Sequence, residues 1–314
     1  MQAGPSDLSA LAGLTTESRR PELVDLDVLP TVRLVELFLA GEVAGLQALL
    51  GLAGQLGRAV DAIAERFGRG GRNVYVGAGT AGRLGWLDAV ECVPTFGVPP
   101  QQMVALLAGG AGALINSREG DEDDEAAGRA DIKQAGVGVS DAVVAVSASG
   151  RTPYTLAAAA AARTAGALTV AVVNNSGSPL AASADVAIEA VVGPEFIAGS
   201  TRLKAGTAQK VLLNALSTLV MVRTGRTLGD LMVDVQATND KLRDRGRRVV
   251  MAATGASADR AAAALNAAGG EVKTAIVMAA GDVGAGSARA SLADHQGSTR
   301  GALLEITGIE QETP

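Results

Sequence analysis

The feature that most constrains the fold is a regular alternation of two patterns that begins at Arg72. Short apolar runs rich in valine and alanine are each followed by a turn of glycine or hydroxyl-bearing residues, and then by a helical pattern. These runs cover residues 73–76, 103–108, 142–146, 168–173 and 186–190. Because buried strands that alternate with helices form parallel sheets covered on both faces, the chain is predicted to be α/β, with a three-layer parallel-sheet domain. In such folds the ligand binds beyond the carboxyl ends of the strands.

Helical patterns flank this sheet on both sides. Apolar residues from Leu34 to Ile63 recur at helical spacing, which predicts two helices before the first strand. Small helices are predicted after the sheet, with Ser257 as an N-cap and Gly269-Gly270 as a helix stop. We therefore predict an N-terminal helical segment (1–55), the parallel-sheet domain (56–248) and a small C-terminal helical subdomain (249–314).

Composition disfavours several classes of partner and site. The 314 residues carry a formal net charge of −6, so the chain lacks the basic surface that nucleic-acid binding requires. One cysteine, Cys92, and one histidine, His295, leave no intrachain disulfide and disfavour a metal site. The first residues do not resemble a secretory leader, and we expect no apolar run of membrane-spanning length. These features predict a cytoplasmic protein that binds neither nucleic acid nor membrane.

Two hydroxyl-rich segments stand where helices are predicted to begin. Ser147-Ala-Ser-Gly-Arg-Thr-Pro153 joins the run 142–146 to an alanine-rich helix, which Ser149 or Thr152 is expected to cap. The segment Gly199–Lys210 opens a second apolar helix. Helix N-termini favour anions, and the chain has too few aromatic residues for a nucleobase platform. Both segments therefore predict binding of a small phosphorylated ligand, with a sugar phosphate as the leading candidate.

A glycine-rich turn after the first predicted strand allows more than one interpretation. Gly77-Ala-Gly-Thr-Ala-Gly82 matches the dinucleotide-binding pattern, but residues 98–102 lack the carboxylate that should meet the ribose. A P-loop is disfavoured because Arg83-Leu84 replaces the required lysine and hydroxyl residue. Two interpretations stay open. The glycines permit a tight turn, or they let a non-nucleotide ligand approach the backbone beside the Thr80 hydroxyl.

Two glutamates are candidates for acid–base chemistry. Glu91 lies where the helix after the glycine turn is expected to end, beside a loop over 94–97, and Glu122 lies in the acidic cluster 119–124. Such a cluster is usually a solvated surface, and it also suits a magnesium ion. If the two carboxyl groups meet at the strand ends, they can supply an acid and a base. Cys92 is expected to pack as a small apolar residue.

Longer motifs resemble one enzyme family. The resemblance to the N-acetylmuramic acid 6-phosphate etherase family covers about residues 14–304, nearly the whole chain. The motifs that carry it are 77–85, 87–97, 119–124, 148–154, 199–210 and 231–234. Three residues depart from the family's usual pattern, because Ala81 replaces serine, Val93 replaces proline and Asp230 replaces asparagine. The missing serine hydroxyl at position 81 is expected to weaken one ligand contact.

This resemblance implies a fold, an activity and a set of site residues. It implies a sugar isomerase (SIS) fold, a homodimer, and cleavage of the lactyl ether of N-acetylmuramic acid 6-phosphate to N-acetylglucosamine 6-phosphate and D-lactate, without a metal or nucleotide cofactor. The family's acid–base glutamates correspond to Glu91, the proton donor, and Glu122. We expect the phosphate to be held by hydroxyls, backbone amides and one cation, from Thr80, Ser149, Gly150, Thr152, Ser200 and Lys204.

Two other classes of protein share the expected fold and phosphate site. A sugar-phosphate sensor needs only the phosphate loops, whereas this chain also retains both glutamates. An aldose–ketose isomerase would release no lactate, so product analysis separates it from an etherase.

Overall fold

Contacts between residues divide the chain into two compact units. This computed structural model describes residues 13–116, 118–235 and 240–308. The first unit contains Met1–Ala89 and Gln101–Ser217, and the second contains Val90–Pro100 and Thr218–Pro314. The boundary predicted at residue 249 for the small helical subdomain lies inside helix α9 (Asp240–Thr254). The contacts group all of α9 with the helices that follow it, because its apolar residues are buried in their core.

The sheet belongs to the first unit and is parallel throughout. Its strands are β1 (Asn73–Gly77), β2 (Met103–Leu107), β3 (Ala142–Ser147), β4 (Leu168–Val173) and β5 (Val186–Glu189), in the order β2-β1-β3-β4-β5. All five apolar runs therefore form strands, which confirms the predicted α/β class. The central strands read as continuous apolar runs because both of their faces are buried. The strand order reverses between β1 and β3, which pair with Gly77 opposite Val146.

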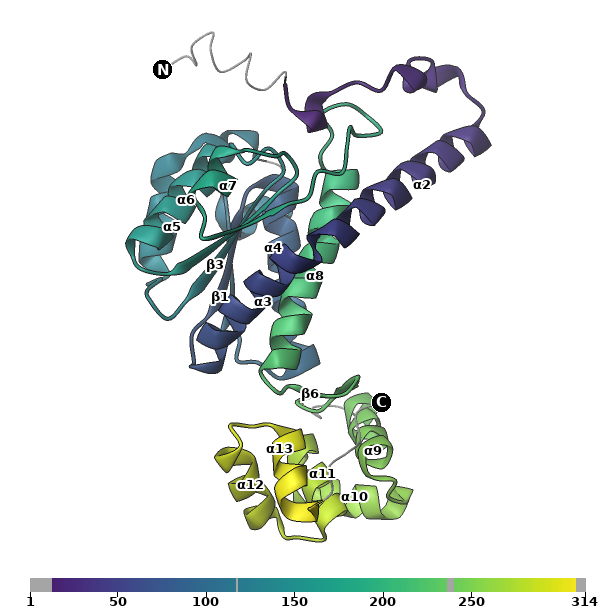
Figure 1. Ribbon diagram of the computed structural model, residues 1–314, viewed down its shortest axis with the longest axis vertical. Helices are drawn as coiled ribbons and strands as arrows, with labels where there is room; N and C mark the ends of the chain where they lie inside the picture. Colours follow the sequence, from purple (N-terminus) through teal and green to yellow (C-terminus); the bar gives the residue numbers. More distant parts are fainter. Residues whose placement is uncertain (1–12, 117, 236–239, 309–314) are drawn as a thin grey trace. The chain divides into compact units, whose positions relative to one another are not determined.

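Helices cover both faces of this sheet. On one face lie α5 (Glu125–Gln134), α6 (Pro153–Thr164) and α7 (Pro179–Ser183), and on the other lie α3 (Ala53–Gly68), α4 (Gly79–Phe96) and α8 (Lys204–Arg223) (Figure 1). Helix α2 (Thr31–Ala48) precedes α3, so the two predicted N-terminal helices are confirmed. Short 3-10 helices fill several connections: η1 (Thr15–Glu17), η2 (Pro21–Leu23), η3 (Leu26–Val28), η4 (Leu49–Leu52), η5 (Gly110–Leu114) and η6 (Glu119–Asp123).

Helix α4 is longer than the sequence predicts. Residues 94–97 are expected to form a loop, but the helix continues to Phe96 with Pro94 inside it. The proline lies in the last turn, where it removes only one backbone hydrogen bond. The Thr95 hydroxyl donates to the Glu91 carbonyl at 2.7 Å, and the helix stops at Gly97, whose φ is 61°. Glu91 therefore lies inside the helix instead of at its end.

A buried carboxylate joins the first half of α4 to β1 and α8. Asp88 accepts hydrogen bonds from the Tyr75 hydroxyl at 2.6 Å, from Asn214 Nδ2 at 2.7 Å and from the Ser217 hydroxyl at 3.1 Å. Burial raises the pKa of Asp88, and the three hydrogen bonds offset part of this rise. The network fixes the helix that begins at the glycine-rich turn.

The second unit is mainly helical. It contains α9, α10 (Ala258–Ala267), α11 (Val272–Gly281), α12 (Ala285–Asp294), α13 (Thr299–Thr307) and a short hairpin of β6 (Thr227–Leu228) and β7 (Leu231–Met232). Helix α11 is its central element, because it packs against the other four helices. The Ser257 hydroxyl caps α10 as predicted, accepting from the Arg260 N–H at 3.3 Å. Gly269 and Gly270 follow with positive φ, which confirms the predicted helix stop.

Two helical stretches are long and apolar enough to cross a membrane, judged by length and composition alone. They are Thr31–Gly68 and Lys204–Arg223, so the expectation that no such run exists is wrong. More than half of the apolar window in α8 is buried, as in the core helix of many soluble proteins. Almost none of the window in Thr31–Gly68 is buried in this chain. Val32, Val35, Leu39 and Leu46 form an exposed stripe on α2 at heptad-like spacing.

Candidate active site

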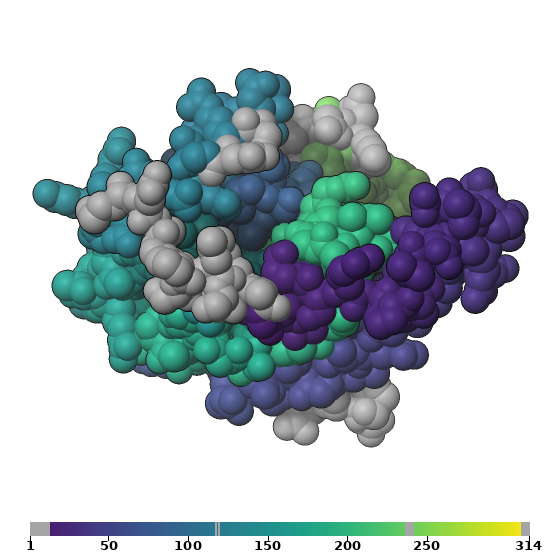
Figure 2. Space-filling view, turned by 90° about the horizontal axis from the view of Figure 1, so that it is seen from above, coloured from purple at the N-terminus to yellow at the C-terminus, as the bar shows by residue number. Residues whose placement is uncertain are grey.

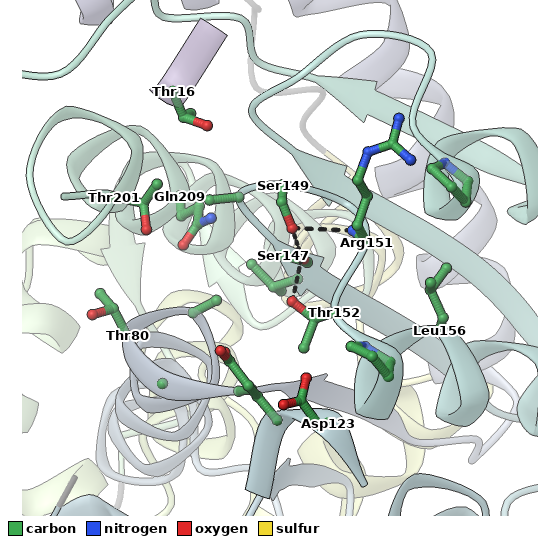
Figure 3. Close-up of a pocket in the computed structure, with 18 of the residues that line it drawn as sticks. Thr16, Thr80, Asp123, Ser147, Ser149, Arg151, Thr152, Leu156, Thr201 and Gln209 are labelled. Carbon is green, nitrogen blue, oxygen red and sulfur yellow. Dashed lines mark hydrogen bonds between the residues drawn. The ribbon is translucent and has the colours of Figure 1, made fainter. Parts of the chain in front are cut away.

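A cavity of about 760 Å³ opens at the point where the strand order reverses. Its walls come from the ends of β1 and β3, the first turns of α4 and α6, the acidic helix η6 and the loop before α8 (Figure 3). Ligands of open α/β sheets bind in this position. Because two long helices begin at the cavity, their positive N-terminal ends favour an anion there.

The glycine-rich turn has a packing role. Gly79 adopts a φ of 54° at the start of α4. A Cβ on Gly82 would lie 2.5 Å from the Gly77 carbonyl oxygen, so only glycine lets the helix approach the strand this closely. Thr80 and Ala81 line the cavity immediately after this turn. The tight-turn interpretation is therefore confirmed, whereas ligand approach beside Thr80, which lines the cavity, stays a prediction.

The loop after β3 brings its hydroxyls together. Ser147 Oγ lies 3.0 Å from Thr152 Oγ1 and 3.4 Å from Ser149 Oγ, and Figure 3 shows the three side chains converging. Ser149 also accepts from the Arg151 N–H at 3.1 Å. All four residues line the cavity. The loop can therefore surround an anion with hydroxyl donors.

The N-cap position of α6 and the glycine of this loop have different roles. Thr152 occupies the N-cap position of α6 but makes no side-chain capping bond, because its hydroxyl contacts Ser147 instead. The sequence predicts that Ser149 or Thr152 caps the helix, but Thr152 makes no capping bond and Ser149 accepts from the Arg151 N–H, which precedes the helix. Pro153 does stand in the first turn, as predicted. Gly150 shapes the loop: its φ is 64°, and a Cβ there would lie 2.2 Å from Ser178 Oγ.

The N-terminus of α8 is occupied by the chain's own carboxylate. Glu195 accepts from the Lys204 N–H at 2.8 Å and from the Ala205 N–H at 2.9 Å. Burial raises the pKa of this carboxyl group, although the two backbone donors favour its ionised form. The anion at this helix start is thus Glu195, which occupies these two amides, and the predicted role of the segment Gly199–Lys210 in ligand binding stays a prediction.

The two residues predicted from this helix start, Ser200 and Lys204, lie outside the described lining of the cavity. Lys204 is 7% exposed and packs against Gly45 of α2, where a Cβ would lie 2.6 Å from its side chain. Burial and the nearby Arg20 lower the pKa of Lys204. Neither Lys204 nor Ser200 is among the described residues that line the cavity, whereas Gly199 and Thr201 are. Their roles in ligand binding stay predictions.

One of the two predicted catalytic glutamates lines the cavity. Glu122 does so from η6, together with Asp123 and Glu125. Asp124, in the same cluster, caps α5 by accepting from the Ala127 N–H at 2.9 Å. Glu91 is exposed on the part of α4 that groups with the second unit, and it is not among the described lining residues. The catalytic pair therefore stays a prediction.

The described residues contain no group of three or more His, Cys, Asp or Glu side chains suited to a metal ion. Cys92 is 3% exposed, in agreement with its predicted packing role. His295 lies at the end of α12, and its Nδ1 is 2.9 Å from the Ser291 carbonyl oxygen.

One wall of the cavity, which comes from the N-terminal segment, is not predicted from the sequence. Thr16 and Glu17 line the cavity from η1. Asn175 holds this segment, because its Oδ1 accepts from the Thr15 N–H at 2.8 Å and its Nδ2 donates to Thr16 Oγ1 at 3.1 Å. The Gly199 N–H also donates to the Thr16 carbonyl at 3.0 Å. Figure 2 shows the purple N-terminal residues lying against the green surface of α8 and its preceding loop.

Comparison with known proteins identifies the family. The family model for the glucokinase regulatory protein N-terminal SIS domain matches residues 55–163, and the SIS domain model matches residues 133–219. An N-acetylmuramic acid 6-phosphate etherase from Rubrobacter xylanophilus is 54% identical over 295 residues, which cover 94% of this chain and 97% of that protein. The chain belongs to the N-acetylmuramic acid 6-phosphate etherase family. The family member from Streptomyces coelicolor is 50% identical and covers 97% of this chain and 98% of its own.

The SIS matches and the parallel sheet together confirm the predicted SIS fold. Among solved structures, a phosphoheptose isomerase from Francisella tularensis aligns with a TM-score of 0.48 at 15% identity. The alignment covers 61% of this chain and 98% of that chain.

Proposed function

We propose that this chain is an N-acetylmuramic acid 6-phosphate etherase, which releases D-lactate and N-acetylglucosamine 6-phosphate without a cofactor. The observation that carries the proposal is the cavity at two helix N-termini, lined by hydroxyls and by Glu122, in a member of the etherase family. Such a cavity suits a small phosphorylated sugar. We also propose a cytoplasmic location, where the enzyme would meet this phosphorylated substrate.

The mechanism follows from the chemistry of the substrate. An ether at C3 is a poor leaving group, but opening of the sugar ring to its aldehyde makes the C2 proton removable. Elimination can then release lactate, and water adds afterwards at C3. Glu122 is proposed to remove the C2 proton or to activate the water, and Glu91 to protonate the departing lactate. Each positioned proton transfer contributes about 10²–10⁴-fold to the rate.

The phosphate is proposed to bind away from the reacting carbons. Ser149, Thr152 and Thr80 present hydroxyls at the starts of α6 and α4. These contacts would fix the orientation of the sugar, so that its C2 and C3 atoms lie near Glu122. A serine hydroxyl at position 81 is missing, and the methyl group of Ala81 lines the cavity instead.

We also propose that the protein is a homodimer. The exposed stripe on α2 (Val32, Val35, Leu39 and Leu46) is too regular for a solvated surface, and its spacing is typical of helices that pack against each other. Light scattering should give twice the mass of the chain. Leu39→Arg should shift the mass toward the monomer, whereas Arg33→Ala on the same helix should not. A monomeric wild-type protein would contradict this proposal.

Product analysis tests the proposed activity and its independence of cofactors. Incubation with N-acetylmuramic acid 6-phosphate should release D-lactate at an equal rate with and without EDTA, and without added nucleotide. An aldose–ketose isomerase would convert the sugar without releasing lactate. Loss of lactate release on chelation, restored by a divalent ion, would overturn the cofactor-independent mechanism.

A further inference from the structure

The balance of charge in the cavity is unusual for a site that binds anions. Four carboxylates of the described part of the chain line it, from Glu17, Glu122, Asp123 and Glu125. Arg151 is the one cationic side chain among the described residues that do so. The substrate of the proposed function brings two further anionic groups, its phosphate and its lactyl carboxylate. Since like charges repel in a partly enclosed site, these anions require positive partners.

Arg151 has hydrogen-bonding capacity that the protein does not use. Its Nε is buried and has no hydrogen-bond partner among the described residues. The ion pairs between described residues do not include its guanidinium group. Buried polar groups are normally satisfied, so an orphaned donor beside a cavity indicates a missing acceptor. The backbone of Arg151 is held in place, because its N–H donates to Ser149 Oγ (Figure 3).

The two anions of the substrate have different partners available. The phosphate can use the hydroxyls of the β3–α6 loop and the N-terminal ends of α4 and α6. The other polar side chains of the described lining, from Thr16, Thr201 and Gln209, are neutral, so Arg151 is the one charged donor that this lining offers to the lactyl carboxylate. Lys204, the cation expected from the sequence, is buried against α2 instead. A guanidinium group matches the planar geometry of a carboxylate and can donate two parallel hydrogen bonds to it.

We propose that Arg151 binds the lactyl carboxylate and thereby selects lactyl ethers over sugar phosphates that lack this group. This inference rests on the proposed function. Arg151 is then a specificity-determining residue, which neutralises the second anion of the substrate beside the cavity's own carboxylates. It also orients the leaving group, because the carboxylate is bonded directly to the lactyl carbon that carries the ether oxygen.

The test compares two ligands that differ in the lactyl group alone. For Arg151→Ala, kcat/KM on N-acetylmuramic acid 6-phosphate should fall by about 10- to 100-fold, mainly through KM, as expected for a hydrogen bond to a charged group. The Kd for N-acetylglucosamine 6-phosphate, measured by calorimetry, should change less than about twofold, because hydrogen bonds to its phosphate and hydroxyls do not involve Arg151. Arg151→Lys should lower kcat/KM on N-acetylmuramic acid 6-phosphate less than Arg151→Ala does, because lysine keeps the positive charge although it lacks the planar guanidinium group.

Arg163→Ala is the matched control, because it removes the same charge from the far end of α6, outside the lining of the cavity. It should leave both measurements unchanged. If Arg151→Ala weakens kcat/KM for the substrate and the affinity for N-acetylglucosamine 6-phosphate equally, Arg151 binds the phosphate. If the kinetics of Arg151→Ala are unchanged, Arg151 does not contact the substrate. Either result overturns the inference while lactate release by the wild-type protein still supports the proposed function. Failure of the wild-type protein to release lactate would instead overturn the proposed function itself.

Discussion

Glu122→Gln should lower kcat for lactate release by about 10²–10⁴-fold, the contribution of one positioned proton transfer. The glutamine keeps the shape of the side chain and its position in η6 but can neither accept nor return a proton at the reacting carbon. The substrate should therefore still bind, and the Kd for N-acetylglucosamine 6-phosphate should stay close to that of the wild-type protein. Steady-state kinetics and calorimetry measure the two effects separately.

Asp124→Asn is the matched control for Glu122. It removes a charge from the same acidic cluster, and asparagine caps helices as well as aspartate does, so the bond to the Ala127 N–H can persist. We expect its kcat to remain within about twofold, since Asp124 makes none of the proposed proton transfers. Near wild-type turnover in Glu122→Gln would show that Glu122 neither removes the C2 proton nor activates the water. The same assay on Glu91→Gln tests the second glutamate, which is expected to show a comparable loss.

The phosphate should be the main anchor of the substrate, so N-acetylmuramic acid without phosphate should be a very poor substrate. Ser149→Ala should raise KM for the phosphorylated substrate by about 10- to 100-fold if its contact is uniform through the reaction, as expected for a hydrogen bond to a charged group. A contact that tightens only in the transition state would lower kcat instead. Kinetics on both sugars separate these cases.

Ser183→Ala removes an exposed serine hydroxyl of α7, outside the lining of the cavity, and should leave both kinetic parameters unchanged. Equal efficiency on the phosphorylated and unphosphorylated sugars would show that the phosphate does not anchor the substrate. If Ser149→Ala leaves KM and kcat unchanged, the phosphate does not bind at the β3–α6 loop.

The fold could be predicted because its signals are local. Strands such as β3 and β4 are apolar along their whole length, since both faces are buried, and each is followed by glycine or polar residues. The same is true of one part of the site. Ser149 and Thr152 follow β3 directly, so their place at the carboxyl end of the sheet follows from the strand itself.

Other parts of the site depend on contacts that no local pattern contains. Thr16 reaches the cavity because Asn175, 159 positions later, binds its hydroxyl. Glu195 occupies the start of α8 from nine positions before Lys204, which turns an expected ligand site into an internal cap. The expected role of Lys204 depended on a free helix start, whereas its side chain packs on α2. Tertiary contacts therefore determine the positions of Thr16, Glu195 and Lys204.

We propose that the chain cleaves the lactyl ether by elimination and then hydration. Incubation with N-acetylmuramic acid 6-phosphate in water enriched in oxygen-18, with mass spectrometry of both products, tests this reaction directly. Elimination breaks the bond between C3 and the ether oxygen, which leaves with lactate, and water then supplies the new oxygen at C3. We predict D-lactate and N-acetylglucosamine 6-phosphate in equal amounts, with the label at C3 of the sugar and none in the lactate hydroxyl. No lactate, or label in the lactate hydroxyl, would contradict this account.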